Sequence, residues 1–514
     1  MENDLEIELK LALPPRQAAR FRGHPVLSGI KPARHALHSI YFDTPDFELM
    51  RRGIALRVRQ VSFHWVQTMK TEGRALGALS HRSEWEMALA GGGNPDFAIL
   101  PKAALDLLDG VDLNRIVPAF ATRFQRTTWQ IERDGNHAEL ALDSGEIQAG
   151  EARQKISEVE LELKSGSAGF LFDLAAQLLA RMPLHTEPRS KAQRGYALCG
   201  AITPAPVKAI RPEICPHQSA GEAWNAVMHA ALAQMVANVP GALEEADNIE
   251  YLHQLRIGLR RLMVGVTLAK AFGQASPAWA PGLGETMRAL NPARDWDVFL
   301  HDTLPKTRAA LGGTLANSFA NTPTQSSLEQ TLLAQLRDVA ASARLQAQAH
   351  LLAPAYTRLV LDIGRCLLAE HDDDANDAED GALEATAWAA ALLEKRWLTL
   401  RKRCRGFSKL GPTERHMARI AAKKMRYAAD AFAPLYGKRG TRFIEALAAL
   451  QNSLGRANDA HVGARLLDAL PKKSAPLSFE FGRLAGALDV EAGRKAQLSG
   501  AIWRRLAQSR LFWR

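Results

Sequence analysis

The stretch Glu6-Ile7-Glu8-Leu9-Lys10, close to the start of the 514-residue chain, alternates charged and apolar side chains without a break. A period of two predicts a β-strand whose charged side chains share one face. Such a face is either a solvated strand edge or one wall of an enclosed polar cavity. A wall of that kind needs partners of opposite charge, so the rest of the chain decides between the two interpretations.

The same alternation recurs along the first 200 residues. Segments with charged side chains on one face lie at 54–59, 64–71, 82–86, 139–143 and 158–164. With further strands expected at 38–44 and near 119–132, there are seven or eight strands. They cannot all be edges, whereas an antiparallel sheet that closes on itself removes the edges and encloses one face. The pattern therefore predicts a closed antiparallel sheet, a β tunnel, with a charged interior. Carboxylates in that interior suit Mg²⁺ or Mn²⁺, and Arg and Lys side chains suit phosphate oxygens.

The charged motifs occur in the order ExExK at 6–10, Arg57/Arg59, Lys70, Arg82-x-Glu84-x-Glu86, Asp143, Glu158/Glu160/Glu162 and Ser190-Lys191. This order resembles the CYTH superfamily, the triphosphate tunnel metalloenzymes, over residues 1–203. The resemblance implies an eight-stranded antiparallel tunnel that hydrolyses triphosphates with a divalent metal. Sequence alone shows no Walker loop, so a P-loop NTPase is disfavoured.

The resemblance also implies roles for individual residues. The metal ligands would be Glu6, Glu8, Glu158 and Glu160, with Asp143 and Glu162 as further ligands. The phosphates would be held by Arg57, Arg59, Arg82, Arg126 and Lys191, and the catalytic residues would be Lys10 and Lys70. Arg123 is an alternative to Arg126, but an offset of three residues reverses the strand face.

Residues 204–216 form a proline-rich linker, and the periodicity changes after it. The segment 203–217 carries four prolines and is typical of a semi-rigid spacer. Beyond it, Ala- and Leu-rich segments with a period of 3.6 predict an all-α domain over 217–514. The expected organisation is thus an α+β multidomain protein, with a tunnel domain at 1–203, the linker at 204–216 and a helical domain at 217–514.

The helical part contains an internal repeat. The nine residues from His253 to Arg261 align with the nine from His416 to Lys424, and a second matching piece follows about forty residues after each histidine, at 291–298 and 454–462. Two half-domains built on one helical unit are expected. His253, Arg256 and Arg260 share one helix face, opposite a leucine stripe, and we expect that face to be exposed.

This half resembles the CHAD domain, a helical module often fused behind CYTH domains. The resemblance implies binding of long-chain inorganic polyphosphate by His253, Arg256, Arg260, His416, Arg419, Lys423 and Lys424. Two alternatives stay open for these residues: a solvated basic face, and ion pairs with acids such as Asp295 or Asp459 inside the bundle. Metal binding by the two histidines is disfavoured, because no supporting Cys, His or acid spacing is visible.

Composition limits the cellular setting. The net charge of +10 and the pI of about 9.5 favour a polyanionic partner. The four cysteines are scattered without a CxxC pair, which disfavours zinc or disulfides and favours a reducing compartment. No apolar run of about 18 residues and no signal sequence stand out. We therefore expect no membrane partner and a cytoplasmic location, with polyphosphate granules as an associated structure.

The expected function is hydrolysis of tripolyphosphate to diphosphate and phosphate, with the helical domain binding polyphosphate. Other uses of the same tunnel are hydrolysis of a nucleoside or thiamine triphosphate and cyclisation of ATP. A non-catalytic polyphosphate scaffold is an alternative of a different class. Nucleic-acid binding fits the basic helices, but no recognised nucleic-acid motif accompanies them.

Overall fold

The computed structural model of the protein describes residues 4–514, apart from 62–63, 270–274, 316–322, 374–382 and 471–474. The chain divides into two compact units. The barrel unit contains residues 1–208 together with 232–255 and 351–372, and the helical unit contains 209–231, 256–350 and 373–514.

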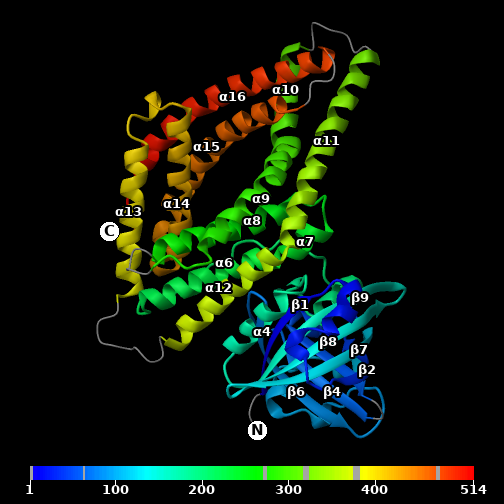
Figure 1. The fold of residues 1–514 in the computed structure, drawn as a ribbon. Coiled ribbons are helices and arrows are strands. Elements are labelled where there is room, and N and C mark those ends of the chain that lie inside the picture. The colour runs from blue at the N-terminus through cyan, green and yellow to red at the C-terminus, as the bar shows by residue number, and fades with distance from the viewer. Residues whose placement is uncertain (1–3, 62–63, 270–274, 316–322, 374–382, 471–474) are drawn as a thin grey trace. The chain divides into compact units, whose positions relative to one another are not determined.

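Eight antiparallel strands of the barrel unit close into a ring, as the sequence predicted (Figure 1). The order around the ring is β1-β9-β8-β7-β2-β3-β4-β6, and β1 closes it by pairing with both β9 and β6. The strands are β1 Asp4–Ala12, β2 Ala33–Asp43, β3 Ile54–Val61, β4 His64–Thr71, β5 Arg74–Leu76, β6 Leu79–Leu89, β7 Val117–Arg133, β8 Asn136–Ala149, β9 Ala152–Ser165 and β10 His185–Thr186.

The alternation of charged and apolar residues explains why the charged face turns inward. Leu9 on β1 and Leu161 on β9 are fully buried, and helix α4 (Gly169–Leu179) packs over these two strands with its own buried leucines. The helix thus covers the apolar face, and the charged face is left to the interior of the ring. The register then sets neighbours across strands, with Glu6 opposite Arg82 and Glu8 opposite Glu162.

Short helices complete the first 200 residues. They are α1 Ala18–Arg22, α2 Glu48–Arg51, α3 Lys102–Asp106 and α5 Lys191–Leu198, besides α4. Helix α5 begins with a capping box, in which the Ser190 side chain accepts from the Gln193 backbone and the Gln193 side chain accepts from the Ser190 backbone.

The long elements beyond residue 219 that the structure describes are helices, as expected. They are α6 Ala220–Ala237, α7 Val239–Glu244, α8 Ile249–Ala269, α9 Ala280–Val298, α10 Leu304–Leu315, α11 Pro323–Leu351, α12 Pro354–Asp373, α13 Ala385–Arg403, α14 Pro412–Tyr436, α15 Thr441–Asp468 and α16 Ala475–Ala507. In the helical unit, α14 packs against α13 and α15, and α15 packs along α16 (Figure 1). The two copies of the repeat fall on equivalent pairs, α8 with α9 and α14 with α15.

One apolar segment was missed by the sequence analysis. The stretch Ala220–Glu244, with a mean hydropathy of 1.3, is long and apolar enough by composition to cross a membrane, and 61% of its most apolar part is buried inside the protein. Trp224, Met228 and Met235 on this stretch are fully or almost fully buried, as in the core helix of a folded domain. All four cysteines are free thiols.

Candidate active site

The interior of the barrel holds a cavity of about 1220 Å³. Nine acidic and nine basic side chains line it. Most come from the inward faces of the strands, and the others come from α2, α5 and the residues that follow β4 and β10. A polar wall of this kind is stable only if opposite charges lie close together. The ion pairs across the cavity are therefore the main features of the site.

The first group of charges surrounds Glu6 and Glu8 on β1. The Lys70 ammonium lies 2.9 Å from both oxygens of Glu6 and 2.9 Å from Glu84. Arg82 donates to Glu6 at 2.5 Å and to Glu8 at 2.7 Å. Burial opposes ionisation of Glu6, but Lys70 and Arg82 outweigh it and hold the pKa of Glu6 well below its usual value.

Glu8 behaves in the opposite way. Burial, together with the nearby charges of Glu160 and Glu6, raises the pKa of Glu8 to about 7 despite Arg82. Burial and the charges of Glu6 and Glu139 also raise the pKa of Glu162 above its usual value, and Glu162 lies directly opposite Glu8 across β1 and β9. This part of the cavity carries more negative charge than its own cations offset.

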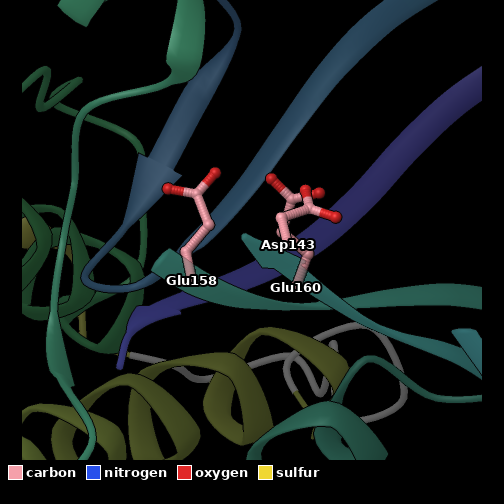
Figure 2. A group of neighbouring side chains, drawn as sticks. All are labelled: Asp143, Glu158 and Glu160. Carbon is pink, nitrogen blue, oxygen red and sulfur yellow. The ribbon is translucent and has the colours of Figure 1, made fainter. Parts of the chain in front are cut away.

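The second group of charges lies where β8 and β9 meet α5. One oxygen each from Asp143, Glu158 and Glu160 lies within 4.8 Å of the others. Figure 2 shows the three carboxyl groups, with that of Glu158 standing apart from the other two. The Lys191 ammonium lies 2.7 Å from Asp143 Oδ2 and 2.7 Å from Glu160 Oε1, and it also contacts Glu158 Oε1. The three acids therefore share one lysine.

Two arginines complete the second group. Arg126 donates to Asp143 from two of its nitrogens, at 2.8 and 2.6 Å, and it also contacts Glu160. Arg194 donates to Glu158 at 2.5 Å. The structure thus turns Arg126 into the barrel, whereas Arg123 is exposed.

Arg57 and Arg59 on β3 form a third, more positive region. Arg57 lies 3.7 Å from Glu84, and Arg59 donates to the Ser39 hydroxyl at 3.1 Å. Burial and the adjacent charges of Arg57 and Arg126 lower the pKa of Arg59 to about 9. A buried guanidinium that is destabilised by like charges is suited to binding an anion.

Lys10 lies in the same cavity, and its ammonium donates to the carbonyl oxygen of Arg189. Burial lowers the pKa of Lys10, although Glu158 and Glu8 oppose the shift. The thirteen tunnel residues expected from the sequence all lie on the inner side of the barrel or in the charged network directly beneath its surface.

Several side chains of the tunnel were not expected from the sequence, and two of them, Arg194 and Phe124, contact residues that were. Arg194 is three residues after Lys191, which places both on one face of α5, and this spacing could have identified it. Phe124 is apolar and gave no such signal, yet its ring centroid lies 6.0 Å from the Arg59 guanidinium, 5.7 Å from that of Arg126 and 5.1 Å from the Lys191 ammonium. These distances are in the range of cation–π contacts.

The helical unit contains a separate cluster of charges, which we call the basic centre. Its members come from both copies of the repeat: Arg256 and Arg260 on α8, Asp295 on α9, Arg419 and Lys423 on α14, and Asp459 on α15. Arg419 lies 3.8 Å from Asp459. Burial and the neighbouring Arg260 and Arg419 lower the pKa of Lys423 to about 6.

The expectation of an exposed basic face is wrong: Arg260, Arg419 and Lys423 are half-buried, and Arg256 is buried. Only 4% of this residue is exposed, and its guanidinium donates to Asn291 Oδ1 at 2.6 Å. Burial and Arg260 lower its pKa to about 9. The helix face that carries the basic residues is covered, because the second helix of each repeat packs against it. That second helix also carries the acids Asp295 and Asp459.

The remaining candidates of the helical part are placed less centrally. His416 is exposed and lies 3.3 Å from Asn458 Oδ1. Lys424 is exposed as well, and its pKa is lowered by partial loss of hydration and by Arg396 on α13 rather than by the basic centre. His253 is half-buried on α8.

A closed antiparallel barrel with acids and bases on its inner wall defines a tunnel protein for a charged substrate. In this chain a helical repeat domain follows the barrel in sequence. Comparison with known families agrees: residues 4–196 match the CYTH domain and residues 226–468 match the CHAD domain. The chain therefore consists of a CYTH domain followed by a CHAD domain.

Individual relatives support both assignments. The inorganic triphosphatase of Haemophilus influenzae is 35% identical over 201 residues, which are 38% of this chain and 56% of that protein. The match thus spans little more than half of that relative's length. The crystal structure of the CHAD domain from the plant Ricinus communis is 29% identical, with a TM-score of 0.50, and the match covers 60% of this chain and 98% of that one.

Proposed function

We propose that the barrel hydrolyses tripolyphosphate to diphosphate and phosphate with a divalent cation, Mg²⁺ or Mn²⁺. The observation that carries this proposal is the separation of charge within one cavity: Glu8 and Glu162 are crowded acids on one wall, and Arg59 on another wall is a cation crowded by Arg57 and Arg126. A metal-bound phosphate chain is the ligand that satisfies both. The likeness to the Haemophilus triphosphatase supports the same reaction.

The carboxylates on the cavity surface fit a hard divalent cation. Like charges directly opposite on paired strands destabilise a sheet, and the Glu8–Glu162 pair is such a case. A cation held by Glu6, Glu8 and Glu162, with Glu160 beside them, would remove this repulsion through the oxygen ligands that Mg²⁺ prefers. When bound, the cation neutralises phosphate charge and activates a water molecule.

The chain's own residues then have distinct tasks. Arg57 and Arg59 bind phosphate oxygens through charge-assisted hydrogen bonds. Lys70 and Arg82 hold Glu6 ionised, which keeps it able to bind a cation. The lowered pKa of Lys10 brings it closer to the range in which a lysine exchanges a proton with water.

Phosphate release tests this proposal. The full chain is incubated with tripolyphosphate, ATP or thiamine triphosphate, each with Mg²⁺ or Mn²⁺ at several pH values. We expect tripolyphosphate to have the highest kcat/KM. A higher kcat/KM for ATP or thiamine triphosphate would assign the tunnel to that substrate, and cyclic AMP from ATP would indicate a cyclase. No turnover of any of them would leave a binding scaffold.

We further propose that the basic centre of the helical unit binds long-chain polyphosphate. Its four basic side chains face two acids, and burial together with the excess positive charge of Arg260 and Arg419 lowers the pKa of Lys423 to about 6. A polyanion would supply the missing negative charge. Gel shifts with long-chain polyphosphate at increasing salt test this, because each phosphate contact adds up to about one unit to the log–log slope of affinity against salt, by analogy with DNA.

A further inference from the structure

The cation that the Asp143, Glu158 and Glu160 carboxylates surround is the ammonium of Lys191. It lies 2.7 Å from one oxygen of Asp143 and 2.7 Å from one oxygen of Glu160, and it contacts one oxygen of Glu158. Three carboxylate oxygens thus lie around the ammonium, which donates a hydrogen bond to Glu160 and forms ion pairs with Asp143 and Glu158. Figure 2 shows the three acids, and the ion-pair distances place the Lys191 nitrogen between them, where a metal ion would otherwise be expected.

Burial separates two acids of this cluster, Asp143 and Glu158, from the cavity, whereas Glu160 and Lys191 reach its surface. Asp143 is 0% exposed, Glu158 is 1% exposed and Lys191 is 7% exposed. Asp143 and Glu158 do not contribute to the described lining of the cavity, whereas Glu6, Glu8, Glu160 and Glu162 do. A hydrated divalent ion that enters the cavity therefore meets the lining acids before it can reach Asp143 or Glu158.

The cluster is also electrically complete. Its three acids are matched by three bases, since Arg126 binds Asp143 and Glu160, and Arg194 binds Glu158. A divalent cation added to a neutral buried cluster would have to displace a cation already bound, which is unfavourable unless that cation finds new partners. The donor set therefore does not fit a resident metal as long as Lys191 is in place.

We propose that Lys191 is the built-in cation of this cluster, and that Asp143 and Glu158 hold the start of helix α5 rather than a metal ion. Lys191 is then a positioning residue, which ties α5 to β8 and β9 and fixes the side of the cavity that α5 provides. This departs from the metal-ligand role that the family resemblance implies for Asp143 and Glu158. It rests on the proposed function only in that the divalent cation binds at the cavity-lining acids.

Counting bound Mn²⁺ tests the proposal on the full chain without substrate. Free Mn²⁺ is measured by electron paramagnetic resonance in titrations of the wild type, Lys191→Ala and the double variant Lys191→Ala/Asp143→Asn. We expect Lys191→Ala to bind one Mn²⁺ per chain more than the wild type, because the three acids lose their cation. The double variant should lose that additional ion again.

The matched control is Lys102→Ala, which removes an exposed lysine that pairs with Asp106 on α3. It should leave the Mn²⁺ count unchanged. An unchanged count in Lys191→Ala, or an additional ion that persists in the double variant, would overturn the proposal.

Two measurements apply even if Lys191→Ala fails to fold. First, Asp143→Asn in the wild-type background should not reduce the Mn²⁺ count, whereas a resident metal at this cluster predicts the loss of one ion. Second, an amine-reactive label followed by peptide mass spectrometry should show Lys191 protected in the wild type with and without saturating Mn²⁺. Labelling that appears only when Mn²⁺ is added would show that metal expels the lysine, and would contradict the proposal.

The results that would disprove the proposed function differ from those that would disprove the role of Lys191. If Glu8→Gln leaves both the Mn²⁺ count and phosphate release unchanged, the cavity-lining acids are not the metal site. A gain of one ion in Lys191→Ala would still support the role of Lys191 as the cation of the buried cluster.

Discussion

The tunnel of the barrel unit and the basic centre of the helical unit both gather buried charges, but they balance them differently. In the tunnel, acidic and basic side chains are equal in number, and most pair across the cavity. In the basic centre, four bases face two acids, and the pKa of Lys423 falls to about 6. A balanced site can take a neutral combination of metal and anion, whereas an unbalanced one attracts an anion alone.

Removing one acid from the tunnel should have the largest effect. Glu8→Gln should lower tripolyphosphate hydrolysis by about 10²–10³-fold, the usual loss when one electrostatic group leaves an enclosed site. Because the pKa of Glu8 is about 7, its carboxylate is protonated as pH falls through 7. Metal affinity of the wild type should therefore weaken below that pH, and the variant should lose this dependence.

Calorimetric titration of Mg²⁺ and a phosphate-release assay at pH 6–9 check these expectations. Glu146→Gln is the matched control, since Glu146 lies on β8 and pairs at the surface with Arg153. Full hydrolysis by Glu8→Gln, or full wild-type hydrolysis in excess EDTA, would show that the tunnel does not use a metal at these acids.

Removing one cation from the tunnel should have the next largest effect. Arg59→Ala should raise KM for tripolyphosphate by roughly 10- to 100-fold, the equivalent of one charge-assisted hydrogen bond, with little loss of thermal stability. Burial and like charges already lower the pKa of Arg59, so the folded protein gains little from this charge. Arg82→Ala should instead lower the melting temperature, because it takes a partner from both Glu6 and Glu8.

Steady-state kinetics and thermal melts on both variants separate the two cases. Equal stability losses for Arg59→Ala and Arg82→Ala would indicate that Arg59 has a structural role like that of Arg82, and the distinction between free and paired cations in the tunnel would not hold.

The basic centre should show a smaller, pH-dependent effect. The pKa of Lys423 is lowered from that of an exposed lysine to about 6, and a bound polyanion would raise it again. Affinity for polyphosphate should therefore increase as pH falls from 8 toward 6, by up to about tenfold per pH unit for one proton taken up. Lys423→Arg should stay charged and lose most of this dependence, and Lys423→Met should bind weakly at every pH.

Stability should change in the opposite direction. A base whose pKa is lowered on folding destabilises the folded state as pH falls from its unfolded pKa through its folded one. Lys423→Met should thus melt at a higher temperature than the wild type at pH 7, while Arg256→Ala should melt lower because it leaves Asn291 without its buried donor. Weaker binding together with a lower melting temperature in Lys423→Met would favour a purely structural ion-pair network.

The smallest effect should come from His416. The side chain is exposed, and its Nδ1 lies 3.3 Å from Asn458 Oδ1. His416→Ala should change polyphosphate affinity by about twofold or less, since surface substitutions are usually worth less than about 0.5 kcal/mol. Gel shifts at pH 6 and pH 8 check this, and a large loss confined to pH 6 would give the histidine the proton-linked role assigned here to Lys423.

The closed barrel could be predicted from the sequence because charged and apolar residues alternate along its strands. The charged residues therefore identify the inner face of each strand. The sequence also predicted the repeat, whose two acids, Asp295 and Asp459, meet in the basic centre. The pairing of Lys191 with three acids could not be read in advance, since it depends on the register of β8 with β9 and on where α5 crosses them. Burial of Arg256 depends likewise on helix packing, which periodicity does not reveal.

Gly145 on β8 limits which residues can stand where β7 and β8 pair. It lies opposite Phe124 across β7 and β8, and a methyl group at this position would come within 2.1 Å of the Arg123 carbonyl oxygen and 2.5 Å of Phe124 Cβ. These contacts are with the β7 backbone and the first side-chain carbon of Phe124, so a smaller residue at position 124 would not make room. Only glycine lets β7 and β8 pair this closely here, so the spacing of two neighbouring strands, as well as their charge, constrains how this site can vary.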